Sequence, residues 1–249
     1  MAIDGPAASG KGTVARAVAD VLGYRYLDTG AMYRALALVA RQRGVPLTDE
    51  AALADLARSV RMEFRAADGP GPARIFVDGH DLSEAIRTQQ VGEDASAIAV
   101  YPAVRRALVA LQQALAAEGG VVVDGRDIGT VVLPDAELKI YLDATPEERA
   151  RRRWAELQSR GVDVGLDEVL AEIHRRDRQD SGRATGPLRK ADDAITIDTT
   201  GRPPDDVLAE ILARAAERGA RPPTPIAPGS GADAGRPTTG ALDASPPDA

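Results

Sequence analysis

The chain has 249 residues, of which 44% are hydrophobic and 28% charged, and its formal net charge is -7. This length suits one α/β domain of about 200 residues with additions. The acidic balance argues against a general nucleic-acid or anionic-membrane binder, because both need a basic surface. Cysteine is absent, which excludes disulfide frameworks, thiolate zinc sites and cysteine nucleophiles.

Other routes to metal binding and membrane targeting are also few. His80 and His174 are the two histidines, and they lie too far apart in the sequence to indicate a ligand pair. No stretch approaches the roughly 20 apolar residues of a membrane helix, and the first residues lack a signal-peptide pattern. We therefore expect a cytoplasmic protein without nucleic-acid or membrane partners, in which any metal arrives with a substrate.

The first predicted element is an apolar strand at residues 1–4, followed by a glycine-rich loop and a helix over residues 11–22. A second strand at residues 24–27 and a second helix at residues 31–43 follow, and the helix stops at Gly44. The chain therefore begins as β-α-β-α.

The period of the apolar residues changes to two at residues 60–77. Val60, Met62 and Phe64 alternate with charged residues, and a Gly-Pro turn at residues 69–72 follows them. This alternation predicts a small β-hairpin inserted in an α/β chain.

The second half returns to the α/β pattern, with a predicted helix over residues 101–118. Thr145 starts a capping box with a proline at the first helical position, so we expect another helix from there through the following arginines. Five apolar strands separated by helices predict a parallel sheet covered on both faces. The remaining predicted elements are strands at 121–124, 138–142 and 194–197 and a helix at about 204–218.

The two ends of the chain carry their own expectations. Residues 220–249 are rich in proline, glycine and alanine and almost lack large apolar residues, so we predict a disordered tail. At the start, only residues 1–3 precede Asp4, whereas a central strand has about five residues. We expect either a truncated first strand or a true start upstream of Met1.

Residues 5–13, with the sequence GPAASGKGT, have the features of a phosphate cradle. Glycines let backbone amides approach an anion, a helix N-terminus attracts it, and Lys11 adds a flexible cation. The spacing matches a P-loop, but Gly12 separates the lysine from Thr13, so the strict Gly-Lys-Ser/Thr form is not met. The loop is predicted to bind through Gly5, Pro6, Ala7, Ala8, Ser9, Gly10, Lys11, Gly12 and Thr13.

Three alternatives compete with a P-loop at this position. A simple connecting turn would not need a lysine there, and lysine occurs only at positions 11, 139 and 190. A dinucleotide-binding loop needs Gly-x-Gly-x-x-Gly, which this turn lacks. A GTPase normally carries an Asn-Lys-x-Asp base reader, and the chain contains no asparagine.

The chain resembles the bacterial cytidylate kinases, which belong to the nucleoside monophosphate kinases among the P-loop NTPases. The resemblance covers residues 1 to about 215 and implies a three-layer sandwich with a five-stranded parallel sheet, the inserted hairpin region and an arginine-rich helical lid. The segments that carry it are IDGPAASGKGT at 3–13, LDTGAMYR at 27–34, IRTQQV at 86–91, residues 96–105, DGRDIGT at 124–130 and RDRQDSGR at 176–183.

The resemblance also implies a division of the chain. The kinase domain spans residues 1–219, followed by the tail at 220–249. Its parts are a core at 1–60, 100–148 and 188–219, an insert that binds the nucleoside monophosphate at about 61–99, and a lid at about 149–187.

The acceptor site follows from the same match. Arg34, Arg105 and Arg126 correspond to the arginines that grip the acceptor phosphate, and guanidinium forks suit a phosphate dianion. A hydroxyl and a carboxylate can accept from the cytosine amino group, which favours cytosine over uracil. Ser96 and Asp127, with Arg105 and Arg183, match this pyrimidine-reading group.

The rest of the site is carried over in the same way, although each residue alone could be an ordinary surface or capping residue. Asp180 and Arg176 match positions that hold the pentose hydroxyls, and Thr29 lines the same site. The implied substrate-binding set is Thr29, Arg34, Ser96, Arg105, Arg126, Asp127, Arg176, Asp180 and Arg183.

The implied reaction moves the γ-phosphoryl group of MgATP to CMP or dCMP, with Lys11 and Arg126 as the catalytic residues. ATP and magnesium are the implied cofactors, and Thr13 and Asp124 are the candidates to reach the magnesium shell, without a direct protein cage. A monomer is the family expectation. Another acceptor such as AMP, UMP or shikimate, and a nucleotide-binding module without turnover, remain the alternatives.

In the lid, the resemblance leads us to expect an arginine that moves over the triphosphate when water is excluded. The pattern does not select one arginine. The candidates are Arg149, Arg151, Arg152 and Arg153.

Overall fold

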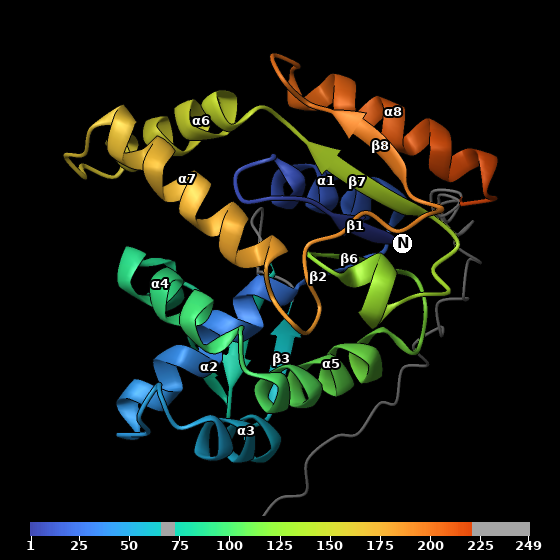
Figure 1. The fold of residues 1–249 in the computed structure, drawn as a ribbon. Coiled ribbons are helices and arrows are strands. Elements are labelled where there is room, and N and C mark those ends of the chain that lie inside the picture. Colours follow the sequence, from blue (N-terminus) through green and yellow to red (C-terminus); the bar gives the residue numbers. More distant parts are fainter. Residues whose placement is uncertain (66–72, 221–249) are drawn as a thin grey trace, which may run out of the picture.

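The structure, a computed structural model, describes residues 1–65 and 73–220. Its centre is a five-stranded parallel sheet with the strand order β2-β6-β1-β7-β8 (Figure 1). Each predicted core strand is confirmed, with its ends shifted by no more than one residue. The strands are β1 (Ala2–Asp4), β2 (Arg25–Asp28), β6 (Val121–Gly125), β7 (Lys139–Asp143) and β8 (Ile195–Asp198).

The short central strand β1 pairs on both of its edges. Its three residues are buried, and they align with residues of β6 on one side and of β7 on the other. The Val123 N–H donates to the Met1 carbonyl oxygen at 3.1 Å, so the ladder extends one residue before the strand. This pairing fixes where the following loop begins.

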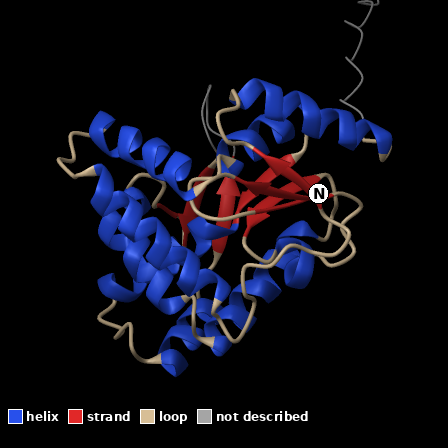
Figure 2. Ribbon diagram, turned by 45° about the horizontal axis from the view of Figure 1, so that its top comes forward, coloured by secondary structure: helices blue, strands red, loops and turns tan. Residues whose placement is uncertain are grey.

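Helices cover both faces of the sheet, as the alternation of strands and helices predicts (Figures 1 and 2). One face packs Ile3 and Ile140 against α1 and α8, and the other packs Val121 and Val123 against the remaining core helices. Each fully buried aliphatic side chain contributes about 1.5–3 kcal/mol to this core. The core helices are α1 (Lys11–Leu22), α2 (Thr29–Gln42), α3 (Glu50–Ser59), α5 (Pro102–Ala116) and α8 (Pro204–Glu217).

The predicted hairpin is present and has one more strand than expected. Strands β3 (Met62–Arg65) and β4 (Arg74–Val77) pair antiparallel, and the two-residue strand β5 (His80–Asp81) extends them to a three-stranded sheet. The short helix η1 (Ala85–Arg87) and α4 (Gln89–Ile98) follow. The turn predicted at residues 69–72 lies outside the described residues, as does the tail from residue 221 onward.

Two antiparallel helices, α6 (Pro146–Ser159) and α7 (Leu166–Ser181), project from the core as an arm beside the sheet (Figure 1). The predicted cap is present, because the Glu148 N–H donates to Thr145 Oγ1 at 3.3 Å. The Arg149 guanidinium pairs with Asp177 at 2.6 Å and joins the two helices. No helix in the described part of the chain is long and apolar enough to span a membrane.

Candidate active site

The glycine-rich loop connects the end of β1 to the start of α1, at the carboxyl edge of the sheet. A Cβ atom at Gly5 would overlap the Leu142 carbonyl oxygen, so only glycine lets the chain pass β7 this closely. Gly10 caps α1 with a left-handed φ of 87°, a conformation that favours glycine. Lys11 curls back over the loop, and its Nζ donates to the Pro6 carbonyl oxygen at 3.1 Å.

The groups around Lys11 act in opposite directions on its protonation. Burial and the nearby Arg126 guanidinium lower the pKa of Lys11 to about 7, although Asp124 and Asp28 favour its charged form. An anion bound beside the Lys11 ammonium would favour the charged form further. The lysine is therefore poised to take up a proton when a phosphate enters the loop.

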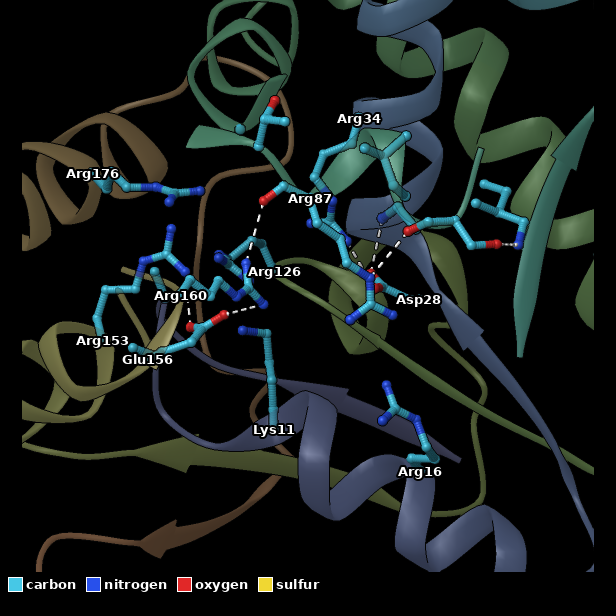
Figure 3. Close-up of a pocket in the computed structure, with 18 of the residues that line it drawn as sticks. Lys11, Arg16, Asp28, Arg34, Arg87, Arg126, Arg153, Glu156, Arg160 and Arg176 are labelled. Atoms are coloured by element: carbon cyan, nitrogen blue, oxygen red, sulfur yellow. Dashed lines mark hydrogen bonds and ion pairs between the residues drawn. The ribbon is translucent and has the colours of Figure 1, made fainter. Parts of the chain in front are cut away.

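A cavity of about 340 Å³ opens beside the loop, between the residue 62–98 segment and helices α6 and α7 (Figure 3). Eight cationic side chains and three carboxylates line it, although the whole chain is acidic. This focus of positive charge fits a polyanionic ligand. The cations are Lys11, Arg16, Arg34, Arg87, Arg126, Arg153, Arg160 and Arg176, and the carboxylates are Asp28, Glu156 and Glu172.

An adjoining cavity of about 390 Å³ holds the whole predicted acceptor set. Lys11, Arg34, Arg126 and Arg176 line both cavities, which therefore lie side by side. The structure brings together nine residues that are spread from position 29 to position 183: Thr29, Arg34, Ser96, Arg105, Arg126, Asp127, Arg176, Asp180 and Arg183.

Ion pairs hold most of these arginines in place. Asp180 accepts from Arg126 Nε at 2.8 Å and also pairs with Arg183. Arg105 pairs with Asp127, and both side chains are buried. Burial raises the pKa of Asp127, and the Arg105 guanidinium opposes that rise. The pairs orient the guanidinium groups before a ligand arrives.

Four residues that line the acceptor cavity each carry a buried polar atom without a hydrogen-bond partner. Within residues 1–65 and 73–220, these atoms include the Tyr33 hydroxyl and the Nε atoms of Arg105, Arg176 and Arg183. Burying a polar atom without a partner costs free energy, so this part of the chain is not arranged for stability alone.

Asp124, at the end of β6, is the carboxylate that fits a divalent cation. Tyr26 Oη donates to Asp124 Oδ2 at 3.0 Å. Burial and repulsion from Asp28 raise the pKa of Asp124 to about 6, and a cation would relieve both effects. A Cβ atom at Gly12 would lie 3.3 Å from Asp124 Oδ2, so the carboxylate abuts the first turn of α1. The other candidate, Thr13, is exposed and lines neither cavity.

The four lid arginines have different environments. Arg149 is buried on Asp177, and Arg152 donates to the Ser9 carbonyl oxygen and to Thr199. Arg151 is 61% exposed and pairs with Glu148. Of the four, Arg153 lines the cavity beside the loop (Figure 3).

Some cavity residues were missed by the sequence analysis. Asp28 accepts the Ala31 N–H at 2.9 Å as the cap of α2, and it pairs with Arg34 at 2.9 Å. Burial alone would raise the pKa of Asp28, but Arg34 and the Ala31 N–H hold it below its ordinary value. Its position before a helix was a readable capping signal. Tyr33 had a signal as the tyrosine of the LDTGAMYR segment, although no role was predicted for it, whereas Glu156 had none.

The glycine-rich loop and the two adjoining cationic cavities have the features of a P-loop phosphotransferase. The match to known proteins is specific. The chain belongs to the cytidylate kinase family, which it matches over residues 1–217.

Individual relatives support the same membership. The cytidylate kinase of Pelotomaculum thermopropionicum is 52% identical over 214 residues, which cover 86% of this chain and 94% of that protein. The cytidylate kinase of Stutzerimonas stutzeri is 51% identical, with coverage of 88% and 95%. Among solved structures, an uncharacterized protein from Eubacterium ventriosum covers 87% of this chain and 97% of its own, with 13% identity and a TM-score of 0.48. That structural likeness supports no further conclusion.

Proposed function

We propose that this chain transfers the γ-phosphoryl group of MgATP to CMP or dCMP, giving ADP and CDP or dCDP. The observation that carries the proposal is that all nine predicted acceptor residues line one cavity, which Lys11 of the glycine-rich loop also lines. Pyrimidine nucleotide metabolism in the cytoplasm, carried out by a monomer, is the setting we propose. The relatives named cytidylate kinase support the choice of acceptor.

The residues shared by the two cavities lie where donor and acceptor phosphates would meet. Lys11 and the loop amides would hold the β- and γ-phosphates, and Arg126 with Arg34 would align the attacking oxygen. A phosphate dianion is already nucleophilic, so the transfer needs no general base. When bound, magnesium would neutralise triphosphate charge, and Asp124, which lines the acceptor cavity, would hold it. Thr13 is exposed and lies outside both cavities, so it is the weaker of the two candidates.

The cytosine preference rests on the deep end of the acceptor cavity. The Asp127 carboxylate lines that part of the cavity and can accept a hydrogen bond from the exocyclic amino group of cytosine. The Arg105 guanidinium supplies hydrogen-bond donors beside it. Uracil places a carbonyl oxygen where cytosine places the amino group, so it would face a carboxylate. A buried polar group left unpaired in this way disfavours the wrong base.

The proposal is tested by incubating the protein with MgATP and CMP, dCMP, UMP or AMP in parallel and resolving the products. CDP and dCDP are expected, with a markedly higher kcat/KM than for the other two acceptors. Efficient phosphorylation of UMP or AMP without CDP formation would show that the acceptor is wrong. Nucleotide binding without any turnover would favour a binding module instead.

A further inference from the structure

Helix α4 and helix α7 form opposite walls of the acceptor cavity. Gly92, Ala95 and Ser96 on α4 line one side, and Arg176 and Asp180 on α7 line the other. The two helices come from segments about 80 residues apart in the chain, so the cavity keeps its shape only while these segments stay together.

Contact between the two walls is sparse. A groove of about 230 Å³ separates part of α4 from α7 outside the acceptor cavity. A Cβ atom at Gly92 would meet nothing within 4 Å, so α4 offers no side chain there to fill the gap. Because α4 and α7 pack little against each other, a single polar contact contributes more to keeping them together.

Gln179 supplies the shorter of two such contacts. Its Nε2 donates to the Ser96 carbonyl oxygen at 2.8 Å, whereas Arg160 NH1 donates to the Arg87 carbonyl oxygen at 3.3 Å in an exposed setting. One partner of each bond lies in the α6–α7 arm, including the turn after α6, and the other lies between residues 73 and 98. Within the described residues, these are the two side-chain hydrogen bonds that join the arm to that segment.

Gln179 lines the outer groove and not the acceptor cavity, so it does not touch the ligand site. It reaches that site through its neighbours. Ser96, whose carbonyl oxygen it holds, lines the cavity, and Asp180, the next residue on α7, anchors Arg126 and Arg183.

We propose that Gln179 is a positioning residue that closes the acceptor cavity, by fastening α7 to the Ser96 backbone on α4. We call this hydrogen bond the α4–α7 clasp. It places the arginine anchor Asp180 and the pyrimidine-reading wall at the separation that the acceptor needs. The clasp rests on the proposed function for the identity of the acceptor, and its role is specific to that substrate.

Loss of the clasp should weaken acceptor binding without touching the phosphate loop. Gln179→Ala is expected to raise the KM for CMP and the Kd for CMP about 3- to 10-fold, the range of one net hydrogen bond. The KM for ATP should change less than about twofold. Gln179→Glu keeps the length of the side chain but gives up the N–H donor, so it should show at least the same rise.

Gln158→Ala is the matched control. Gln158 is also a glutamine of the α6–α7 arm, but its Nε2 donates to the Val164 carbonyl oxygen at 3.3 Å, within the arm itself. This variant should leave the KM for CMP unchanged. Steady-state kinetics, CMP titration by calorimetry and melting curves on all four proteins provide the readout.

The outcomes separate the two proposals. An active wild type whose Gln179 variants keep the wild-type KM and Kd for CMP would overturn the clasp alone. Equal rises in the KM for CMP and for ATP would also overturn it, because they would indicate a general structural effect. A wild type that neither binds nor phosphorylates CMP would contradict the proposed function and the clasp together.

Discussion

Lys11 is the residue at which charge and burial oppose each other most directly. In the free protein its pKa is lowered to about 7, first by burial and then by Arg126. Below that pH the side chain is charged, and above it the neutral form dominates. A bound triphosphate favours the charged form, so binding above pH 7 should draw a proton from solution.

We therefore expect proton uptake on binding of ATP without magnesium at pH 8. The uptake should be a measurable fraction of one proton per ATP, since burial and Arg126 lower the pKa of Lys11 to about 7 and leave much of it neutral at pH 8. Calorimetry in two buffers of different ionisation enthalpy measures this number. Lys11→Arg, which stays charged, is the control and should show almost none. A wild type without uptake would mean that Lys11 is already charged in the free protein.

Asp180 is the second residue that carries a prediction, because it anchors two arginines of the acceptor cavity. Asp180→Ala leaves Arg126 and Arg183 without this partner and is expected to raise the KM for CMP about 10- to 100-fold. The KM for ATP should change far less. Asp193→Ala, which removes an exposed partner of Lys139, is the control for loss of an ion pair. An equal effect of Asp180→Ala on both substrates would remove this residue from the acceptor site.

The predictability of individual residues followed the kind of signal that each carries. The nine residues were predicted to bind the acceptor because their motifs resemble a family, and the structure places all nine in one cavity. Glu156 was missed because nothing in its local sequence says which face of α6 meets the cavity. Tyr33 belongs to the LDTGAMYR motif, but the motif alone did not assign it a role. Arg153 could not be separated from its three arginine neighbours, since the direction of a side chain depends on how α6 packs.

At the scale of elements, the loop after α7 is as important as the helices. Gly186 lies in this loop with a left-handed φ of 57°, and a Cβ atom there would overlap the Arg105 guanidinium and the Asp127 carboxylate. The loop therefore presses its backbone against the buried ion pair at the deep end of the acceptor cavity.

Gly186→Ala is expected to displace this ion pair and to raise the KM for CMP by about 10-fold or more. Gly201→Ala is the matched control, because Gly201 has a similar φ of 66° with nothing within 4 Å of its Cβ position. Both variants should lose about 1 kcal/mol of stability from the left-handed backbone. Thermal melting measures the loss of stability that both variants share, and kinetics measure the rise in the KM for CMP that is expected for Gly186→Ala alone. Equal KM values for the two variants would contradict the role of Gly186.

The core elements could be predicted closely because apolar spacing decides them. Several further elements were not predicted, among them α3, α4, η1 and β5. Helix α3 carried a readable signal in the Asp49 cap and the spacing of Leu53 and Leu56. Strand β5 has two residues, too few for any alternation, and the turn after Asp127 is wound as a π-helix over Ile128–Val132, which propensity does not distinguish.

At the scale of the whole molecule, the residues that line the two cavities all lie at or before position 183. The family match ends at residue 217. A chain shortened to end at Ala220 is therefore expected to keep its kcat, its KM values and its melting temperature within experimental error. Kinetics and melting curves on the two lengths check this, and a loss of activity would show that residues 221–249 contribute to the reaction.

The layered architecture was predictable because each strand and helix carries its own apolar face. The meeting of distant segments was not. The approach of α7 to α4 and of Arg160 to the Arg87 carbonyl oxygen depends on how the whole chain packs, and no local pattern encodes it. The residues of the site could be predicted from the sequence, but the contacts that hold α4 and α7 on either side of it could not.

The carboxylate of Asp4 joins two segments that lie 124 residues apart in the chain. It accepts the Ile128 and Gly129 N–H groups at 2.7 and 2.8 Å, and the residue after it is the first glycine of the phosphate loop. The glycine-rich loop and the turn that follows Arg126 and Asp127 are thus held by one buried side chain. Loss of the Asp4 carboxylate would leave both segments without this common support.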